Sequence, residues 1–240
     1  MNIALIGYGK MGKMVEKIAV ERGHCVVLTI DVDNLSDFTA ENLQKSQLAI
    51  EFTNPHTAFD NIRRCIDCGV PVVSGSTGWY DRFDELKNFC SEKNGTMLCA
   101  SNFSLGVNVL FELNRQLAKI MNRFDSYKVD IEETHHTQKL DAPSGTAITL
   151  AEGIIDNIQR VNNWKLGDDH CSETIPVTAI RKEDVPGTHK IRYSSDIDDI
   201  EIVHTAHNRK GLAVGAVMAA EFIYDKKGVF YMNDFLKFND

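Results

Sequence analysis

The sequence predicts an α/β protein in two parts, a doubly wound parallel sheet and an α+β region with an open mixed sheet. The first observation is the alternation of short apolar strands with amphipathic helices between residues 2 and 100. The second is the change after residue 104 to one long helical stripe and then to several strand patterns. With 240 residues and 43% hydrophobic composition, the chain fits one large domain or two modest ones.

Composition excludes several classes of protein. The formal net charge of −8 argues against a nucleic-acid-binding scaffold, which needs a clustered basic surface. No run reaches the 18 or so apolar residues of a membrane span, and the first residues form a strand pattern instead of a signal peptide. We therefore expect a cytoplasmic protein with neither nucleic acid nor membrane among its partners.

The six cysteines are scattered, and we expect most of them to be buried, reduced thiols. The pair Cys65-x-x-Cys68 has a spacing that suits metal or redox chemistry, but it falls in a helical run and has no second such pair. The sequence therefore predicts no metal site. The cysteines are Cys25, Cys65, Cys68, Cys90, Cys99 and Cys171.

The amino-terminal strand 2–6 runs directly into a G-x-G-x-x-G turn and then a helical stripe. The next strand, 25–30, ends in Asp31, 19 residues after Gly12, where a Rossmann-type unit places the carboxylate that receives the ribose hydroxyls. Together these features predict a nicotinamide dinucleotide site. The alternative interpretation is that the glycines serve packing alone and that Asp31 merely ends a strand. The residues of the turn are Gly7, Tyr8, Gly9, Lys10, Met11 and Gly12.

Further alternation predicts strands at 48–52, 70–73 and 96–100, with helices at 56–68 and 81–93. Polar or turn-forming residues follow each of these strands, at 52–55, 74–78 and 100–104. Ligands of doubly wound sheets bind at the carboxyl ends of the strands. These three segments are therefore candidate ligand contacts, although each residue taken singly also fits an ordinary loop.

The second part begins near Ser104 with a helical stripe from Val109 to Ile120. The runs 174–180, 188–193 and 200–207 alternate apolar and polar residues, which predicts an open sheet covered on one side. The polar segment 158–174 reads as a surface loop without a function. The final apolar segment 213–224 is compatible with a helix.

The stretch from Glu132 to Ala147 has the features of an active site. A strand enters it, so His135 and His136 should point to opposite faces near the strand end. Ser144 can cap a helix carrying the apolar stripe from Ile148 to Ile158, and its first-turn N–H groups would bind an anion. With the charge of Lys139 and a histidine to transfer protons, this implies a small acid that is protonated during reaction. The alternative is that this stretch has no catalytic role and is only a strand, a solvated turn and a capped helix.

The segment Glu133–Ala147 matches the pattern E-x-H-H-x-x-K-x-D-A-P-S-G-T-A without a gap, and it resembles the signature of the 4-hydroxy-tetrahydrodipicolinate reductase (dihydrodipicolinate reductase) family. The resemblance implies that His135 and Lys139 are the acid/base pair. It implies that the substrate carboxylates are held by His136, Ser144, Gly145 and Thr146. The cofactor contacts at the strand ends would be Phe52, Gly75, Ser76, Thr77, Ala100, Ser101, Asn102 and Phe103.

The same resemblance implies NAD(P)H-dependent reduction of a small cyclic dicarboxylate, a step towards diaminopimelate and lysine. It divides the chain into a dinucleotide-binding domain (1–103 and 209–240) and a substrate-binding and oligomerisation domain (104–208), and it implies a homotetramer. Two alternatives stay open: another two-domain NAD(P)-dependent dehydrogenase of an amino-acid derivative, and a non-catalytic nucleotide-sensing protein.

The cofactor preference is predicted from Asp31-Val32-Asp33. Asp31 can accept hydrogen bonds from both ribose hydroxyls of NADH, whereas the 2′-phosphate of NADPH would meet two carboxylates. Relatives that take NADPH well often have arginine where this chain has Val32. We therefore expect NADH to be preferred and NADPH still usable, with Lys10 and Lys13 as substitute phosphate partners. Arg181 and Arg209 occupy positions where the family tends to have arginine, but no role is assigned to them.

Overall fold

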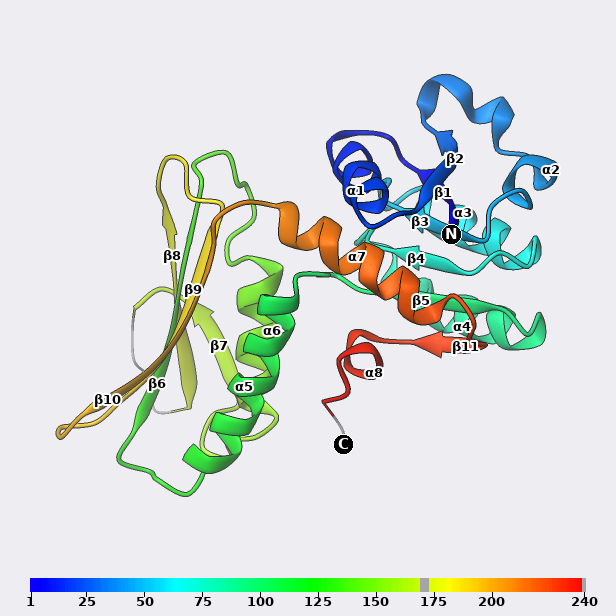
Figure 1. Ribbon diagram of the computed structural model, residues 1–240. Helices are drawn as coiled ribbons and strands as arrows, with labels where there is room; N and C mark the ends of the chain where they lie inside the picture. The colour runs from blue at the N-terminus through cyan, green and yellow to red at the C-terminus, as the bar shows by residue number, and fades with distance from the viewer. Residues whose placement is uncertain (169–172, 239–240) are drawn as a thin grey trace. The chain divides into compact units, whose positions relative to one another are not determined.

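The computed structural model describes residues 1–168 and 173–238, and the chain forms two compact units (Figure 1). Unit 1 comprises Met1–Ser104 and Lys210–Asp240, and unit 2 comprises Leu105–Arg209. Each junction lies one residue beyond the position implied by the family resemblance. Cys171 and the last two residues of the chain lie outside the described residues.

Unit 1 contains a six-stranded parallel sheet with the order β11-β5-β4-β3-β1-β2. The central strands β1, β3, β4 and β5 are buried almost throughout, as expected when helices cover both faces. The strands are β1 (Asn2–Ile6), β2 (Cys25–Ile30), β3 (Leu48–Glu51), β4 (Val72–Ser74), β5 (Thr96–Cys99) and β11 (Gly228–Phe230).

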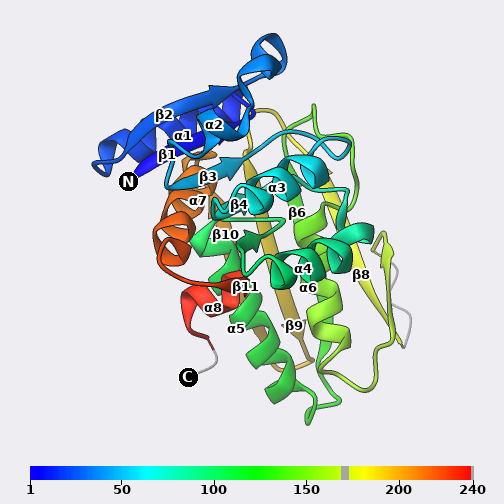
Figure 2. The same cartoon turned by 90° about the vertical axis from the view of Figure 1, so that its right-hand side faces the viewer.

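Helices pack on both faces of this sheet, which makes it doubly wound as predicted. Ile62 of α3 and Leu86 of α4 belong to the core on one face, and these two helices lie towards the viewer in Figure 2. Val15 of α1 and Val217 of α7 belong to the core on the other face. The helices are α1 (Lys10–Glu21), η1 (Val32–Asp37), α2 (Ala40–Leu43), α3 (Ala58–Asp67), η2 (Tyr80–Arg82), α4 (Phe83–Glu92), α7 (Lys210–Ile223) and α8 (Met232–Leu236), with η marking 3₁₀ helices.

Unit 2 contains an open mixed sheet with the order β10-β9-β6-β8-β7. β6 and β7 run parallel to β8, whereas β9 is antiparallel to both β6 and β10. Alternate side chains of β6 and β9 are buried in a core shared with α5 and α6, so the predicted one-sided cover is confirmed (Figure 1). The elements are α5 (Leu105–Met121), β6 (Lys128–His135), α6 (Gly145–Ile155), β7 (Asn163–Leu166), β8 (Thr174–Arg181), β9 (Gly187–Ser194) and β10 (Asp199–Ala206).

Three details of the fold differ from the sequence prediction. The supposed loop 158–174 contains β7, a short edge strand whose Trp164 packs against the core. The strand β11 and the short helices η1, α2 and α8 were not predicted. The helix α6 ends at Ile155, before the end of the predicted apolar stripe. Ile158 is nevertheless buried, because the chain beyond the helix still lies on the core.

The Cys65-x-x-Cys68 pair lies on α3 and at its carboxyl end. Burial raises the pKa of both thiols, most strongly that of Cys65. This environment favours the thiol over the thiolate that metal or redox chemistry needs. Separately, no helix in the described part of the chain combines the length and the apolar character required to span a bilayer.

Candidate active site

The glycine turn between β1 and α1 is shaped by two close contacts. Gly7 has φ of +91°, and a Cβ there would lie 2.0 Å from the carbonyl oxygen of Phe52. A Cβ on Gly12 would lie 2.2 Å from the carbonyl oxygen of Gly7, so only glycine lets α1 begin directly against the turn. A Cβ on Gly9 would meet no protein atom within 4 Å, which leaves space beside the first amides of α1. This arrangement fits a diphosphate group.

A cavity of about 320 Å³ in unit 1 contains four of the predicted cofactor residues, Gly7, Gly9, Asp31 and Phe52, on its wall. Asp31 caps η1 by accepting a 2.9 Å hydrogen bond from the Val32 N–H. Val32 and Leu35 line the same cavity although they are 78% and 62% exposed. The cavity thus combines a carboxylate with open apolar surface, which suits a ribose and an adenine ring.

The other residues of the turn do not line this cavity. Tyr8 donates a hydrogen bond to Glu16, and Lys13 Nζ lies 5.8 Å from the centre of the Tyr8 ring. Lys10 and Met11 belong to the first turn of α1, where Lys10 is exposed and Met11 packs against the core. These residues are therefore placed to support the turn or to meet a phosphate, not to enclose the ribose.

The loops after β3 and β4 are joined by Glu51, a fully buried carboxylate that the sequence reading had not singled out. Glu51 Oε1 accepts hydrogen bonds from the Thr53 N–H at 2.9 Å and from Ser76 Oγ at 2.8 Å. A Cβ on Gly75 would lie 2.1 Å from the Phe52 ring. The predicted cofactor residues Gly75 and Ser76 are thus held close to Phe52, and Thr77 after them is exposed.

After β5, the four predicted cofactor residues have different environments. Ser101 is exposed, whereas Ala100 and Asn102 are half-buried. Phe103 is only 1% exposed and makes an edge-to-face contact with Phe52, with ring centres 6.1 Å apart. Any contact that Phe103 makes with a ligand would therefore come from its backbone.

In unit 2, Glu133 and His135 lie two residues apart on β6 and face the side of the sheet that α5 and α6 cover. Glu133 is fully buried, and both of its carboxylate oxygens lie 3.1 Å from the N–H of Ser144. His135 Nδ1 lies 3.3 Å from Glu133 Oε2. The strand end and the helix start are thus joined through one carboxylate.

His189 of β9 completes this buried cluster. Its Nε2 lies 3.2 Å from Ser144 Oγ and 3.7 Å from Glu133 Oε2. Burial and the neighbouring His135 lower the pKa of His189 to about 4, so His189 is neutral at pH 7. Burial by itself would raise the pKa of Glu133, but the contacts with His135 and Ser144 lower it to about 2. The cluster therefore contains an ionised carboxylate beside a neutral imidazole.

Arg181 of β8 anchors the loop between β6 and α6. Its guanidinium donates hydrogen bonds to the carbonyl oxygens of Lys139 (3.3 Å) and Asp141 (2.6 Å), and Nη2 lies 3.2 Å from Glu133 Oε1. Lys139 Nζ in turn lies 2.8 Å from both carboxylate oxygens of Asp141 and lowers the pKa of that group. The charge of Lys139, which was predicted to attract an anion, is therefore partly balanced by Asp141.

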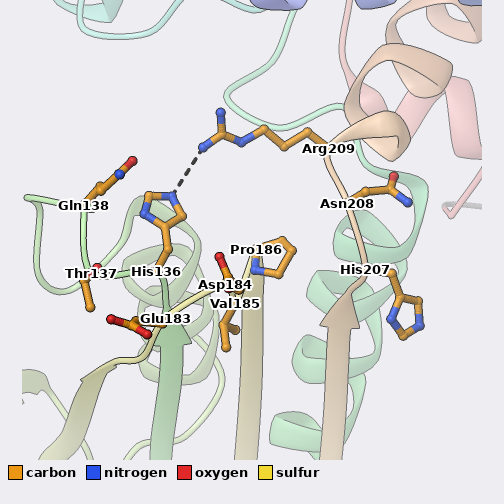
Figure 3. A pocket seen from close by; sticks show the side chains of 10 residues that line it. All are labelled: His136, Thr137, Gln138, Glu183, Asp184, Val185, Pro186, His207, Asn208 and Arg209. Carbon is orange, nitrogen blue, oxygen red and sulfur yellow. Dashed lines mark hydrogen bonds between the residues drawn. The ribbon is translucent and has the colours of Figure 1, made fainter.

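A second cavity, of about 610 Å³, lies beyond the ends of β6, β8 and β10 (Figure 3). His136 and Arg209 point towards each other across it, with Nε2 and Nη2 3.3 Å apart. His135 does not line this cavity, which confirms that the adjacent histidines face different sides. The other lining residues are Thr137, Gln138, Glu183, Asp184, Val185, Pro186, His207 and Asn208.

The predicted anion site at the start of α6 is only partly available. Ser144 caps the helix by accepting a 3.2 Å hydrogen bond from the Ala147 N–H, and its own N–H is bonded to Glu133. Gly145 is exposed and Thr146 is half-buried, and their amides have no acceptor within the helix. Gly145 and Thr146 are thus better placed than Ser144 to hold a carboxylate through the backbone.

Glu133, His135 and His189 also have the residue types of a metal site, since one possible ligand atom from each lies within 4.8 Å of the others. The Glu133 carboxylate already contacts the Arg181 guanidinium and the Ser144 N–H. A divalent cation would have to compete with this positive charge and these hydrogen bonds. The contacts therefore describe a hydrogen-bonded acid network, not a metal centre.

Models of the two halves of dihydrodipicolinate reductase match this chain, the N-terminal part at residues 1–103 and the C-terminal part at residues 106–236. The chain belongs to the dihydrodipicolinate reductase family. The 4-hydroxy-tetrahydrodipicolinate reductase of Christiangramia forsetii is 49% identical over 98% of both chains. The enzyme of that name from Neisseria meningitidis serogroup B is 31% identical over 94% of this chain and 85% of its own.

A solved structure shares the fold of this chain. It is the dipicolinate-bound dihydrodipicolinate reductase from Paenisporosarcina sp. TG-14, with a TM-score of 0.76 and 22% identity over 96% of this chain and 97% of that one. The likeness extends over both units. It confirms a Rossmann-type sheet followed by a second, mixed sheet.

Three residues of the buried cluster have no role predicted from the sequence: Glu133, Arg181 and His189. Glu133 gave a usable signal, since it lies two residues before His135 and must share its face of a strand. His189 gave another, since it occupies the same face as Ile191 and Tyr193 in an alternating run. Arg181 gave only its position at a strand end and the family's tendency to have arginine there.

Proposed function

We propose that this chain is a 4-hydroxy-tetrahydrodipicolinate reductase of diaminopimelate and lysine biosynthesis. The observation that carries the proposal is the 49% identity to a relative of that name over 98% of both chains. The overall reaction consumes the substrate, NAD(P)H and one proton, and it yields tetrahydrodipicolinate, NAD(P)⁺ and water. The two protein tasks are hydride-donor binding in unit 1 and substrate binding with proton transfer in unit 2.

The cofactor, when bound, supplies the hydride from its nicotinamide ring. In unit 1, the turn from Gly7 to Gly12 would hold the diphosphate and Asp31 the adenosine ribose. The strand-end residues would then border the nicotinamide. They are Phe52, Gly75, Ser76, Thr77, Ala100, Ser101, Asn102 and Phe103. The open space at Gly9 supports this assignment, and side chains at Gly7, Gly12 or Gly75 would collide with Phe52 or Gly7 and displace the turn and loops that form the cradle.

In unit 2, the substrate is proposed to be a small cyclic dicarboxylate. His136 with the adjacent Arg209, and the first turn of α6 at Gly145 and Thr146, would bind its carboxylates. Ser144 would contribute mainly by fixing that helix start. His135 and Lys139 would form the acid/base pair, with His135 delivering the proton that completes the reduction.

The preferred cofactor is proposed to be NADH. Asp31 lines the nucleotide cavity and Val32 beside it is 78% exposed, so no arginine meets a 2′-phosphate there. We expect NADH to bind about tenfold more tightly than NADPH, on the order of 1.4 kcal/mol. Val32→Arg should raise NADPH affinity at least tenfold and leave NADH affinity nearly unchanged. Tighter NADPH binding by the unaltered protein, at both low and moderate salt, would show that Lys10 and Lys13 outweigh the carboxylates.

The proposed assembly is a homotetramer, and the proposed location is the cytoplasm, where its cofactor is available. The outer face of the unit 2 sheet supports self-association, because it presents Val203 at 53% exposure and Ile180 at 39% exposure. The same face also carries ion pairs, such as Arg192 with Asp130. A second copy could therefore meet both apolar and charged groups.

The test of the proposed activity is the loss of nicotinamide absorbance on mixing the protein, NADH and freshly generated 4-hydroxy-tetrahydrodipicolinate. Steady oxidation that needs both protein and substrate supports the proposal. A dehydrogenase of another amino-acid derivative would leave this substrate unreduced, and a nucleotide-sensing protein would bind NADH without turnover. Either result would overturn the proposed function.

A further inference from the structure

We propose that Glu133 is the positioning residue of the acid/base site, and that its buried carboxylate orients His135 and stabilises its protonated form. This inference rests on the proposed function, in which His135 donates the proton. No role in the reaction was assigned to Glu133 from the sequence. The contacts that it makes in the folded chain assign one.

The geometry of β6 brings the two side chains together. Glu133 and His135 are separated by one residue, so both project from the helix-covered face, and Nδ1 and Oε2 are 3.3 Å apart. His135 Nδ1 is buried and has no aligned hydrogen-bond partner among the described residues. Glu133 Oε2 is the carboxylate oxygen with which His135 Nδ1 can form an ion pair. A small rotation of the imidazole ring would direct the Nδ1–H at that oxygen.

A glycine lies beside the opposite nitrogen of His135. A Cβ on Gly187, at the start of β9, would lie 3.0 Å from His135 Nε2. Glycine at this position leaves room at the nitrogen that does not face Glu133. The ring thus has one nitrogen facing the carboxylate and one facing the space beside Gly187.

The carboxylate itself is fixed and ionised. The Ser144 N–H bonds both of its oxygens, and Arg181 Nη2 lies 3.2 Å from Oε1. These donors balance the buried negative charge without a proton on Glu133. Glu133 can therefore act through electrostatics in every turnover without changing its own protonation.

The other ionisable groups around His135 come from four segments of unit 2. Two of them, Arg181 and Lys139, carry positive charge, whereas burial lowers the pKa of both His189 and His204 and favours their neutral forms. The Glu133 carboxylate offsets these positive charges beside the His135 ring. These groups are Arg181 on β8, Lys139 in the loop after β6, His189 on β9 and His204 on β10.

In the proposed step, hydride reaches the substrate and the Nε2–H bond of His135 breaks as its proton moves to the adjacent substrate atom. His135 then becomes neutral, keeps its Nδ1–H directed at Glu133, and regains a proton at Nε2 from solvent. Glu133 remains a carboxylate throughout. The step therefore adds one proton to the substrate and removes one from solvent.

The test compares the pH dependence of turnover in Glu133→Gln with that in Glu132→Gln. The control removes the same charge from the neighbouring position, whose side chain is 40% exposed and faces the other side of the sheet. We expect Glu133→Gln to move the alkaline fall of kcat at least one pH unit lower, a tenfold loss on that limb, with KM for NADH unchanged. Glu133→Asp should restore part of the shift, and Glu132→Gln should match the unaltered enzyme.

A second readout does not depend on turnover. Nitrogen-15 NMR of histidine-labelled protein, with His135 assigned by comparison with His135→Gln, should show His135 losing its proton at lower pH in Glu133→Gln. If both the kinetic profile and the NMR titration of Glu133→Gln match those of the unaltered enzyme, the inference is wrong. If the unaltered enzyme itself fails to reduce the substrate, the proposed function fails instead, and the two failures are thus distinguished.

Discussion

His135 and Lys139 are both proposed to take part in proton transfer, yet their surroundings differ. His135 is 8% exposed and lies against Glu133, whereas Lys139 is bonded to the exposed Asp141. Neither contact involves unit 1, so removing either side chain should leave cofactor binding intact. This separation makes the chemical role testable apart from binding.

We predict that His135→Ala and Lys139→Ala each reduce kcat at least about 100-fold, the scale for loss of a general acid. The dissociation constant for NADH, measured by fluorescence titration, should barely change. Lys128→Ala removes an exposed lysine from the first position of β6 and is the matched control. Near-normal turnover in either variant would refute its assigned role, and equal loss of cofactor binding would reveal a structural effect.

The sequence predicted roles for His135 and His136 but not the network that holds His135. Glu133 pairs with His189 across β6 and β9, and His135 pairs with Arg181 across β6 and β8. These neighbours are fixed by strand register, which depends on how separate strands align. A single sequence contains the alternation within each strand but no direct record of that alignment. The motif around His135 could therefore be predicted, whereas its partners on β8 and β9 could not.

At the scale of elements, strand β9 is joined to the start of α6 by the contact between His189 and Ser144. The pKa of His189 is about 4 in the folded chain, against an ordinary value of 6.5. Between these two values the unfolded chain binds the proton and the folded chain does not. The contribution of His189 to the free energy of unfolding is therefore fully present above pH 6.5, and it is lost as the pH is lowered towards 4.

We predict that the free energy of unfolding decreases on the order of 2 kcal/mol between pH 7 and pH 4.5 through His189. His189→Gln keeps an amide near Ser144 but removes the titrating ring, so its decrease should be smaller by about that amount. Urea unfolding monitored by circular dichroism at several pH values measures this difference. The exposed His56→Gln serves as a control with the pH dependence of the unaltered protein. An identical slope for His189→Gln would contradict the assignment.

The long, strongly patterned elements were predicted well, and the short ones at edges were not. β1 and β2 have the predicted bounds because each is an apolar run ended by a glycine or an acid. The sequence predicts no strand at β7 because its four residues include only Trp164 and Leu166 as apolar side chains. β11 has three residues and exists through its pairing with β5. Tertiary contact, not local pattern, decides such strands.

At the scale of the whole molecule, the return of α7 to unit 1 was implied by family resemblance and not by any pattern in the residues. The structure shows its physical basis in the packing of α7. A Cβ on Gly215 would lie 1.7 Å from the carbonyl oxygen of Phe103, so α7 lies directly on the chain after β5. A single glycine permits this approach, and such a contact cannot be read from one sequence.

We predict that four copies of the chain assemble into a tetramer. Light scattering at micromolar concentration should give four times the chain mass of 26.9 kDa. Val203→Lys places a charge on the outer face of the unit 2 sheet and should shift the protein to smaller species, because burying that charge is costly. Val27→Lys, at 44% exposure in unit 1, is the control and should remain assembled. A monomer for the unaltered protein would contradict the proposed tetramer.

The central claim is that unit 1 supplies a hydride donor and unit 2 supplies a proton to one dicarboxylate substrate. The most direct measurement uses NADH carrying deuterium at the transferable position of the nicotinamide, followed by mass spectrometry of the product. We predict tetrahydrodipicolinate one mass unit heavier than the product made with ordinary NADH. Product without the label, or NADH oxidation without formation of this product, would contradict the account.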